Sequence, residues 1–164
     1  MVNRQMAHNY LRNKVENASP IGRIMILMEA CFRFMDQSIR ALEKGDKVAF
    51  VERNIKAQNI IRELRNSLNL EVDEKIAGGF YNLYNFMLKQ LMQSVRTKKI
   101  EPINNVKKQL DQLYQAWKTA EQKGLGKDIK RAEERTQKDG SMVRRINGTE
   151  SQYLQANAGL NVIS

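Results

Sequence analysis

The sequence predicts an all-α protein: an antiparallel four-helix bundle with a short N-terminal helix and a mostly irregular C-terminal tail. The 164 residues include only two prolines, so few positions would interrupt a helix. Apolar residues recur at three- and four-residue steps along four long segments, which is the period of an amphipathic helix. Short links join these segments, and short links favour antiparallel neighbours.

The N-terminal segment, residues 1–17, is polar, and its apolar residues are four positions apart. The pairs are Met6 with Tyr10 and Leu11 with Val15, as in a short amphipathic helix. So short a helix is marginally stable alone, because the cost of nucleation is spread over few hydrogen bonds. We therefore expect this segment to be a mobile lid over a partner-binding groove, with Tyr10 and Leu11 as its anchors.

The first long helix begins at Ser19 and Pro20 and ends at Gly45. Serine can cap a free amide, proline suits the first turn, and glycine commonly terminates a helix. The apolar stripe is wider than one face, which predicts a central helix or one that offers a second face to a partner. The stripe comprises Ile21, Ile24, Met25, Met28, Cys31, Phe32, Met35, Ile39 and Leu42, widened by Ile26, Leu27 and Phe34.

The second long helix is expected to begin at a cap, Asp46, and its apolar stripe is again broad. Two broad stripes on consecutive helices predict a groove that accepts an amphipathic helix, although some members of each stripe must form the core. The leading candidates for partner contact are Ile55, Ile60, Ile61 and Leu64.

A turn over residues 66–73, with Asp73 as a cap, is predicted to precede the third long helix. Gly78 and Gly79 either let another backbone approach closely or mark a late start of this helix. Its predicted stripe is Ile76, Phe80, Leu83, Met87, Leu91 and Val95, with Tyr84, Phe86 and Leu88 outside it. After a link at 98–102, the fourth helix repeats apolar residues in a 3-4-3-4 pattern typical of shallow-angle packing. These residues are Ile103, Val106, Leu110, Leu113 and Trp117.

The bundle is expected to span residues 18–120, because the apolar density falls from residue 121 onward and the segment 121–164 resembles a tail. Within it, Gly140-Ser141-Met142 resembles an engineered junction. The residues from 141 are then either a native tail or an appended segment.

No catalytic, cofactor or metal site is predicted. His8 is the only histidine and Cys31 the only cysteine, so the ligands of a structural zinc site are lacking. Cys31 lies in an apolar stretch and is interpreted as a small core residue. No phosphate-binding glycine motif is present. These observations predict a binding protein rather than an enzyme.

The net charge of +10 is spread along the chain and mixed with acidic residues. Because no basic stripe alternates with aromatic residues, nucleic acid is disfavoured as a partner. No run reaches the length of a membrane helix and no signal-peptide core is present, so we expect a cytoplasmic protein without membrane insertion.

Several motifs resemble the family of flagellin-specific flagellar secretion chaperones, over about residues 8–120. The run from Tyr10 to Val15, followed by Asn17-Ala18-Ser19-Pro20, is similar to the family's N-terminal signature. The run from Lys56 to Leu64 is the most specific similarity. Further similarities are Ile24 to Met28 with Phe32 to Phe34, Leu83 to Met87, and Ala116 to Lys118.

The resemblance implies a four-helix bundle that binds the C-terminal region of newly made flagellin, prevents its premature polymerisation and helps to deliver it to the flagellar export gate. The alternative is a general helical adaptor or regulatory binding protein, linked to nucleic acid by its charge. Salt separates them, because apolar binding to flagellin should survive moderate salt, whereas nucleic-acid binding falls steeply.

The end of the tail bears on the same question. Gln155-Ala156-Asn157 followed by Asn161-Val162-Ile163 is similar to the extreme C-terminus of flagellins, although the usual leucine pair is missing. One hypothesis is therefore a ligand-like segment tethered behind the chaperone, which would raise its effective concentration. The other is a native disordered tail.

Overall fold

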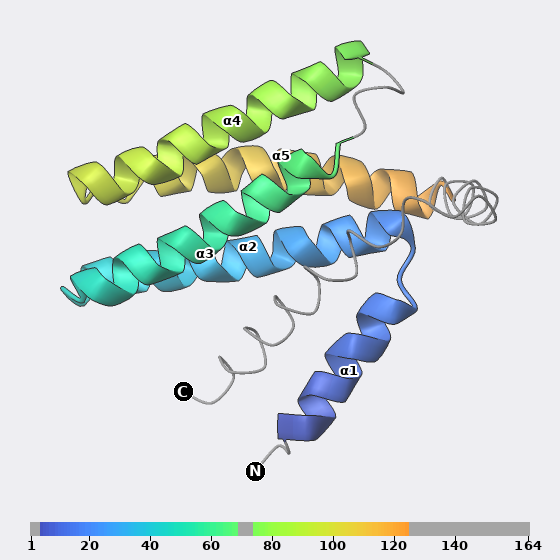
Figure 1. Cartoon of the computed structure of the whole chain (residues 1–164), viewed down its shortest axis with the longest axis horizontal. Helices are drawn as coiled ribbons and strands as arrows, with labels where there is room; N and C mark the ends of the chain where they lie inside the picture. Colours follow the sequence, from blue (N-terminus) through green and yellow to red (C-terminus); the bar gives the residue numbers. More distant parts are fainter. Residues whose placement is uncertain (1–3, 69–73, 125–164) are drawn as a thin grey trace. The chain divides into compact units, whose positions relative to one another are not determined.

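The computed structural model describes residues 4–68 and 74–124, and these residues form five helices and no strand (Figure 1). The helices are α1 (Arg4–Glu16), α2 (Pro20–Glu43), α3 (Lys47–Asn66), α4 (Glu74–Thr97) and α5 (Glu101–Gln122). The predictions that concern Asp73 and the tail beyond residue 124 lie outside the described residues.

The chain divides into two compact units. One unit contains residues 27–116, and the other contains residues 1–26 together with residues 117–164. Helices α2 and α5 each continue from one unit into the other.

Within residues 27–116, the four helices run in alternating directions along the chain, joined by short links at 44–46 and 98–100 (Figure 1). α3 and α4 lie side by side. The predicted all-α antiparallel four-helix bundle is confirmed. None of the described helices is both long enough and apolar enough to cross a membrane.

The turn between α2 and α3 has the chemistry that the sequence predicts. Gly45 has a positive φ of 76°, a conformation that costs glycine little. The amide of Asp46 donates to the carbonyl of Ala41 at 2.9 Å, and the amide of Gly45 donates to Leu42, so the last carbonyls of α2 are satisfied. The Asp46 carboxylate then accepts from the amide of Ala49 at 2.9 Å and caps α3.

In the other unit, the predicted cap at Ser19 is also confirmed. Its hydroxyl oxygen accepts from the amide of Gly22 at 2.9 Å and its hydroxyl donates to Glu121 Oε1 at 2.6 Å. The start of α2 is thereby joined to the end of α5. Gly22 has little room for a side chain, because an added Cβ would lie 3.1 Å from that same hydroxyl oxygen.

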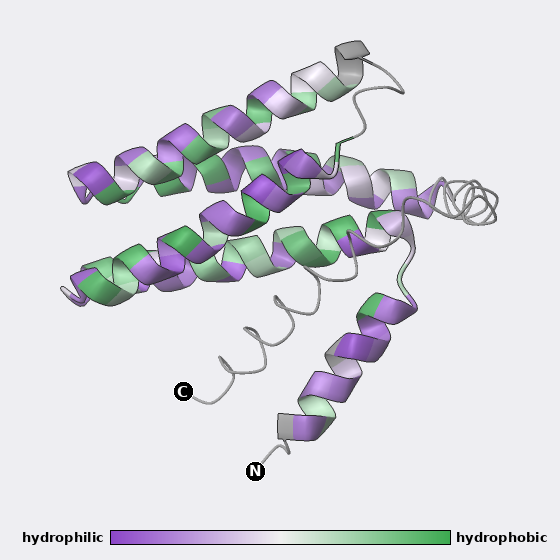
Figure 2. Ribbon diagram, in the orientation of Figure 1, coloured by the Kyte–Doolittle hydropathy of each residue, from purple (hydrophilic) through white to green (hydrophobic). Residues whose placement is uncertain are grey.

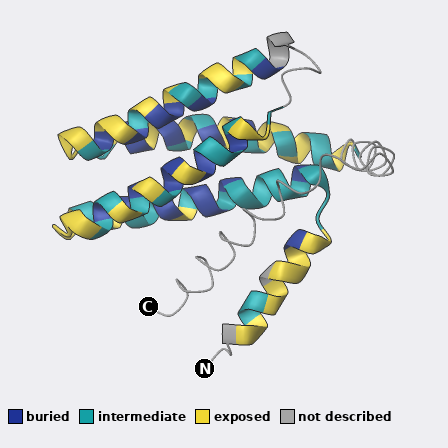
Figure 3. Ribbon diagram, in the orientation of Figure 1, coloured by how far each residue is buried: buried dark blue, intermediate teal, exposed yellow. Residues whose placement is uncertain are grey.

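The core of residues 27–116 lies on the inward faces of the four helices, with exposed residues on their outer faces (Figure 3). Apolar and polar residues accordingly share each helix of this unit (Figure 2). In α5, the predicted members Ile103, Val106, Leu110 and Leu113 are all buried. The largest fully buried side chains of this unit are Met28, Phe34, Met35, Phe50, Ile60, Ile61, Leu64, Met87, Leu91, Ile103 and Leu110.

The buried face of α4 differs from the predicted stripe. Tyr84 and Leu88, which fall outside that stripe, are buried, and so are the small residues Ala77 and Ser94. Leu83, by contrast, is only partly buried. The stripe was misplaced because small residues at inward positions carry little hydropathy signal, so larger residues beside them set the apparent face.

Gly78 and Gly79 lie inside α4, which begins at Glu74, so the late start is not observed. Apart from its own helix, a Cβ added at either glycine would meet no atom of the described residues within 4 Å, so close approach of another backbone is not observed among these residues either. Cys31 is buried and donates to the carbonyl of Ala57 at 3.7 Å, and burial raises the pKa of its thiol. Both facts agree with a small core residue rather than a nucleophile.

Candidate partner-binding groove

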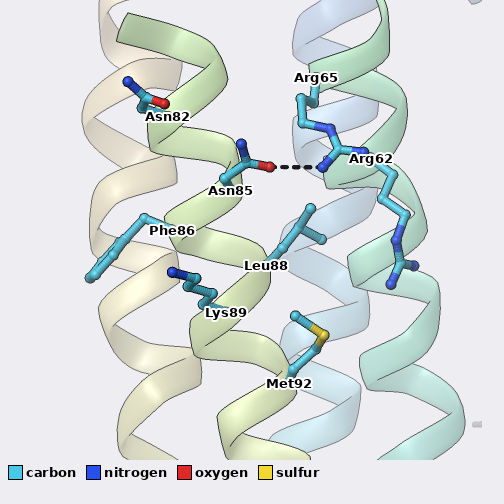
Figure 4. Close-up of a pocket in the computed structure, with 8 residues that line it drawn as sticks. All are labelled: Arg62, Arg65, Asn82, Asn85, Phe86, Leu88, Lys89 and Met92. Atoms are coloured by element: carbon cyan, nitrogen blue, oxygen red, sulfur yellow. Dashed lines mark hydrogen bonds between the residues drawn. The ribbon is translucent and has the colours of Figure 1, made fainter.

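An open groove of about 540 Å³ lies along the line where α3 and α4 pack (Figure 4). α3 contributes two arginines, and α4 contributes amide, apolar and basic side chains. The lining residues are Arg62, Arg65, Asn82, Asn85, Phe86, Leu88, Lys89 and Met92.

Arg65 bridges the two helices across the groove. Its Nη1 atom donates to Asn85 Oδ1 at 2.7 Å (Figure 4). Its guanidinium carbon lies 5.5 Å from the centre of the Tyr81 ring. Its Nε atom is buried and has no hydrogen-bond partner among the described residues. The planar guanidinium is thus fixed from α4 and retains a donor to spare.

Arg62 is held by its own helix. It donates to Asn59 Oδ1 at 2.8 Å and to Gln58 Oε1 at 3.0 Å. Gln58 in turn donates to Asn54 Oδ1 at 2.8 Å, and both of these amides are buried. A short chain of neutral amides therefore positions the Arg62 guanidinium without neutralising its charge.

The groove combines positive charge with apolar surface. Besides the arginines, Lys89 is exposed at its edge, and the lining contains no carboxylate. Leu88 is buried, whereas Phe86 and Met92 are 45% and 47% exposed. Large apolar side chains with that much exposure next to fixed cations can contact a partner that is itself apolar and acidic.

The residues predicted for partner contact fall in different environments. Ile60, Ile61 and Leu64 are buried in the core of residues 27–116. Ile55 is 45% exposed on α3, two helical turns before Arg62. Tyr10 is 68% exposed on α1, in the other unit, and most of α1 is exposed (Figure 3). The side chain of Leu11 lies outside the described part of the structure.

The sequence interpretation missed the groove's arginines as functional candidates. Arg62 lies within the most specific family-like run, from Lys56 to Leu64, in which only apolar residues were predicted to contact a partner. Phe86 carried a usable signal, because it is an aromatic residue outside the apolar stripe of its helix.

The part of the chain that the structure describes holds no group of three or more histidine, cysteine or acidic side chains placed to bind a metal ion. The lining of the groove itself offers hydrogen-bond donors, positive charge and apolar contact, a combination that suits recognition of a polypeptide.

Comparison with known proteins places the chain in a family. Residues 2–124 match the family described as flagellar protein FliS. The flagellar secretion chaperone FliS of Bacillus subtilis is 30% identical over 111 residues, covering 68% of this chain and 82% of that protein. The Salmonella typhimurium protein of the same name is 31% identical over 109 residues, covering 66% and 81%. The Vibrio cholerae protein of the same name is 28% identical over 105 residues, covering 64% and 77%.

The family match covers all four helices of the bundle and ends at residue 124, so it includes only the first four residues of the predicted tail, 121–164. An all-helical bundle and motifs spread from the N-terminal helix to α5 agree with it. The chain belongs to the flagellar protein FliS family, whose named relatives are secretion chaperones and not enzymes.

Proposed function

We propose that this chain is a cytoplasmic export chaperone that binds the C-terminal region of flagellin, prevents its premature polymerisation and aids its delivery to the flagellar export gate. The observation that carries the proposal is the family match over residues 2–124, with relatives that are named flagellar secretion chaperones. The absence of a predicted catalytic site in the sequence accords with a binding role.

The groove supports the proposal physically. A chaperone for an unassembled amphipathic segment must cover the apolar face of that segment and later release it. Exposed Phe86 and Met92 provide apolar contact in the groove, and Ile55 continues it along α3. Ordering a disordered ligand costs part of the contact energy, which keeps the complex reversible.

The predicted contact residues take two roles in this proposal. Tyr10 and Ile55, which are exposed, are proposed to touch flagellin directly, with Leu11 beside Tyr10 in sequence. Ile60, Ile61 and Leu64 are fully or almost fully buried, so they would reach a ligand only if the bundle opened. We propose that they hold the α3 backbone in place behind the groove.

The N-terminal segment, residues 1–17, is proposed to act as a lid. Met6 is 69% exposed and Tyr10 is 68% exposed, so both side chains are available to contact a ligand. α1 has 13 residues, a length that is marginal for an isolated helix.

The test is binding of the full chain to purified flagellin and to flagellin that lacks its C-terminal region, measured by calorimetry. We expect binding only to intact flagellin. Ile55→Asp and Phe86→Asp should each weaken binding about tenfold, because each places a charge against an apolar ligand surface.

The matched control is Val48→Asp, since Val48 is an apolar residue on α3 that is 79% exposed and lies outside the groove lining. It should bind as the unaltered chain does. All three variants should keep the helical circular dichroism spectrum. Equal binding to truncated flagellin would refute the proposed C-terminal specificity.

A further inference from the structure

We propose that the α3–α4 groove is a carboxylate-recognition site, in which Arg62 and Arg65 bind an acidic side chain on an amphipathic helix of the export substrate. The proposal rests on the proposed function and adds to it the chemistry by which the substrate is recognised. It names an electrostatic anchor where the sequence suggested only apolar contact.

The positive charge of the groove is not neutralised by any carboxylate in its lining. Arg62 donates to the amide oxygens of Gln58 and Asn59, and Arg65 donates to the amide oxygen of Asn85. An amide oxygen orients a guanidinium but leaves its full positive charge in place. Elsewhere in the same unit, cations do have carboxylate partners, as Lys107 has Asp36 and Lys56 has Glu52.

Arg65 also has one guanidinium donor without a partner among the described residues. Its Nε atom is buried and lacks a hydrogen-bond partner in the described structure, although an unsatisfied buried donor is costly. The Asn85 contact uses only Nη1. Arg65 as a whole is only partly buried, so a carboxylate can reach its guanidinium edge once the side chain turns Nε toward the groove. A carboxylate is the acceptor that matches the geometry of that edge, and such bonds are shorter and stronger than neutral ones.

The uncharged part of the groove lining favours a polypeptide over nucleic acid as the occupant. Single-stranded nucleic acid is bound by cations at its phosphates and by aromatic rings that stack on its bases. Phe86 is the only aromatic residue of the lining, and Arg65 occupies one face of the neighbouring Tyr81 ring, which is 40% exposed. Leu88 and Met92 supply aliphatic surface instead. Cations beside aliphatic surface complement a helix that carries a carboxylate at the border of its apolar face.

The structure therefore assigns the substrate class as an amphipathic helix with an acidic border, not a purely apolar one. Affinity should then have a moderate salt dependence, set by one or two charge pairs that salt screens. Nucleic-acid binding through many phosphates would fall far more steeply.

The experiment titrates the full chain with a synthetic peptide of the flagellin C-terminal region, at roughly 50 mM and roughly 300 mM salt. A second peptide has its Asp and Glu residues replaced by Asn and Gln. The chain variants are Arg62→Gln/Arg65→Gln and the charge-conserving Arg65→Lys. The control, Arg33→Gln/Arg40→Gln, removes two charges from exposed positions of α2.

We expect Arg62→Gln/Arg65→Gln to bind the acidic peptide about tenfold more weakly than the unaltered chain does at low salt. The variant and the unaltered chain should bind the amide peptide with equal affinity. Arg65→Lys should lose part of the affinity, because lysine keeps the positive charge but lacks the planar guanidinium that can donate two hydrogen bonds to one carboxylate. The α2 control should bind both peptides normally.

Equal affinity of the unaltered chain for the acidic and amide peptides would overturn the carboxylate site while leaving flagellin binding intact. This comparison does not depend on the folding of any variant. Loss of affinity in the α2 control as large as in the groove variant would overturn it too, by showing a net-charge effect. Stronger binding of a single-stranded oligonucleotide than of the acidic peptide would overturn the assigned substrate class. No binding of either peptide would overturn the proposed function with it.

Discussion

Within residues 27–116, the α2–α5 packing line and the α3–α4 packing line differ in how their charged side chains are paired. Between α2 and α5, Lys107 pairs with Asp36, the Tyr114 hydroxyl donates to Glu29 at 2.9 Å, and the rings of Tyr114 and Phe32 meet edge to face at 6.2 Å. Between α3 and α4, the cations meet amides, and a groove remains open beside them.

The difference indicates which of the two lines has charged side chains left for a partner protein. Between α2 and α5, Lys107 pairs with Asp36, and the hydrogen bond to Glu29 raises the pKa of Tyr114. Within residues 27–116, the unpartnered buried atoms on these two helices, Gln37 Oε1 and Gln109 Oε1, belong to neutral amides. The α3–α4 line has a surplus of positive charge and of exposed apolar surface. Side chains that are already paired within the chain gain little from a partner protein. Unpaired donors gain hydrogen bonds on binding, which offsets the free-energy cost of leaving them unpaired.

The largest expected effect concerns the core behind both lines. Ile60→Ala should lower the free energy of unfolding by about 2–5 kcal/mol, because a fully buried side chain leaves a cavity. Ile55→Ala, on the exposed face of the same helix, should change it by less than about 0.5 kcal/mol. Urea unfolding measures both. Similar losses at the two positions would mean that α3 has no single inward face, and the division into core and groove would fail.

A smaller effect should separate the two lines themselves. Tyr114→Phe removes the hydrogen bond to Glu29 and should lower the free energy of unfolding by about 1 kcal/mol. Tyr81→Phe, beside the groove, keeps the ring under Arg65 and should be nearly neutral. Thermal unfolding of the two variants in parallel checks this. An equal or larger loss for Tyr81→Phe would show that the α3–α4 line is as closed as the α2–α5 line.

The sequence predicted the helix ends well, because the chemistry of a helix end is local. Ser19, Gly45 and Asp46 each act within a few residues of their own position, and each was identified from sequence and confirmed. The α5 pattern was equally informative, since large apolar residues occupy its inward positions. α4 was placed less well, because Ala77 and Ser94 are inward but small or polar.

The groove could not be derived in the same way. A broad apolar stripe shows that a helix has two apolar faces, but which face is inward depends on where the neighbouring helices lie. That is why Ile55 and Ile60 were treated alike although only Ile60 is buried. The arginines of α3 and Lys89 of α4 are brought into one site by packing between helices, and no periodicity along the chain records this.

The smallest expected effect is a pH dependence at Glu63, a partly buried carboxylate on α3 that does not line the groove. Burial raises the pKa of Glu63 above its ordinary value, so the folded chain holds this proton more tightly than the unfolded chain does. The resulting stabilisation is full below the unfolded pKa and is lost as the pH rises through the folded pKa. Glu63→Gln should therefore be slightly more stable than the unaltered chain near neutral pH, by no more than about 0.5 kcal/mol, because solvent screens the exposed part of the side chain.

Urea unfolding at roughly pH 4 and roughly pH 7 checks the sign, since the stability advantage of Glu63→Gln should shrink at the lower pH. A Glu63→Gln variant that is less stable near neutral pH would show that this carboxylate has a cationic partner, and α3 would then pair its charges as the α2–α5 line does.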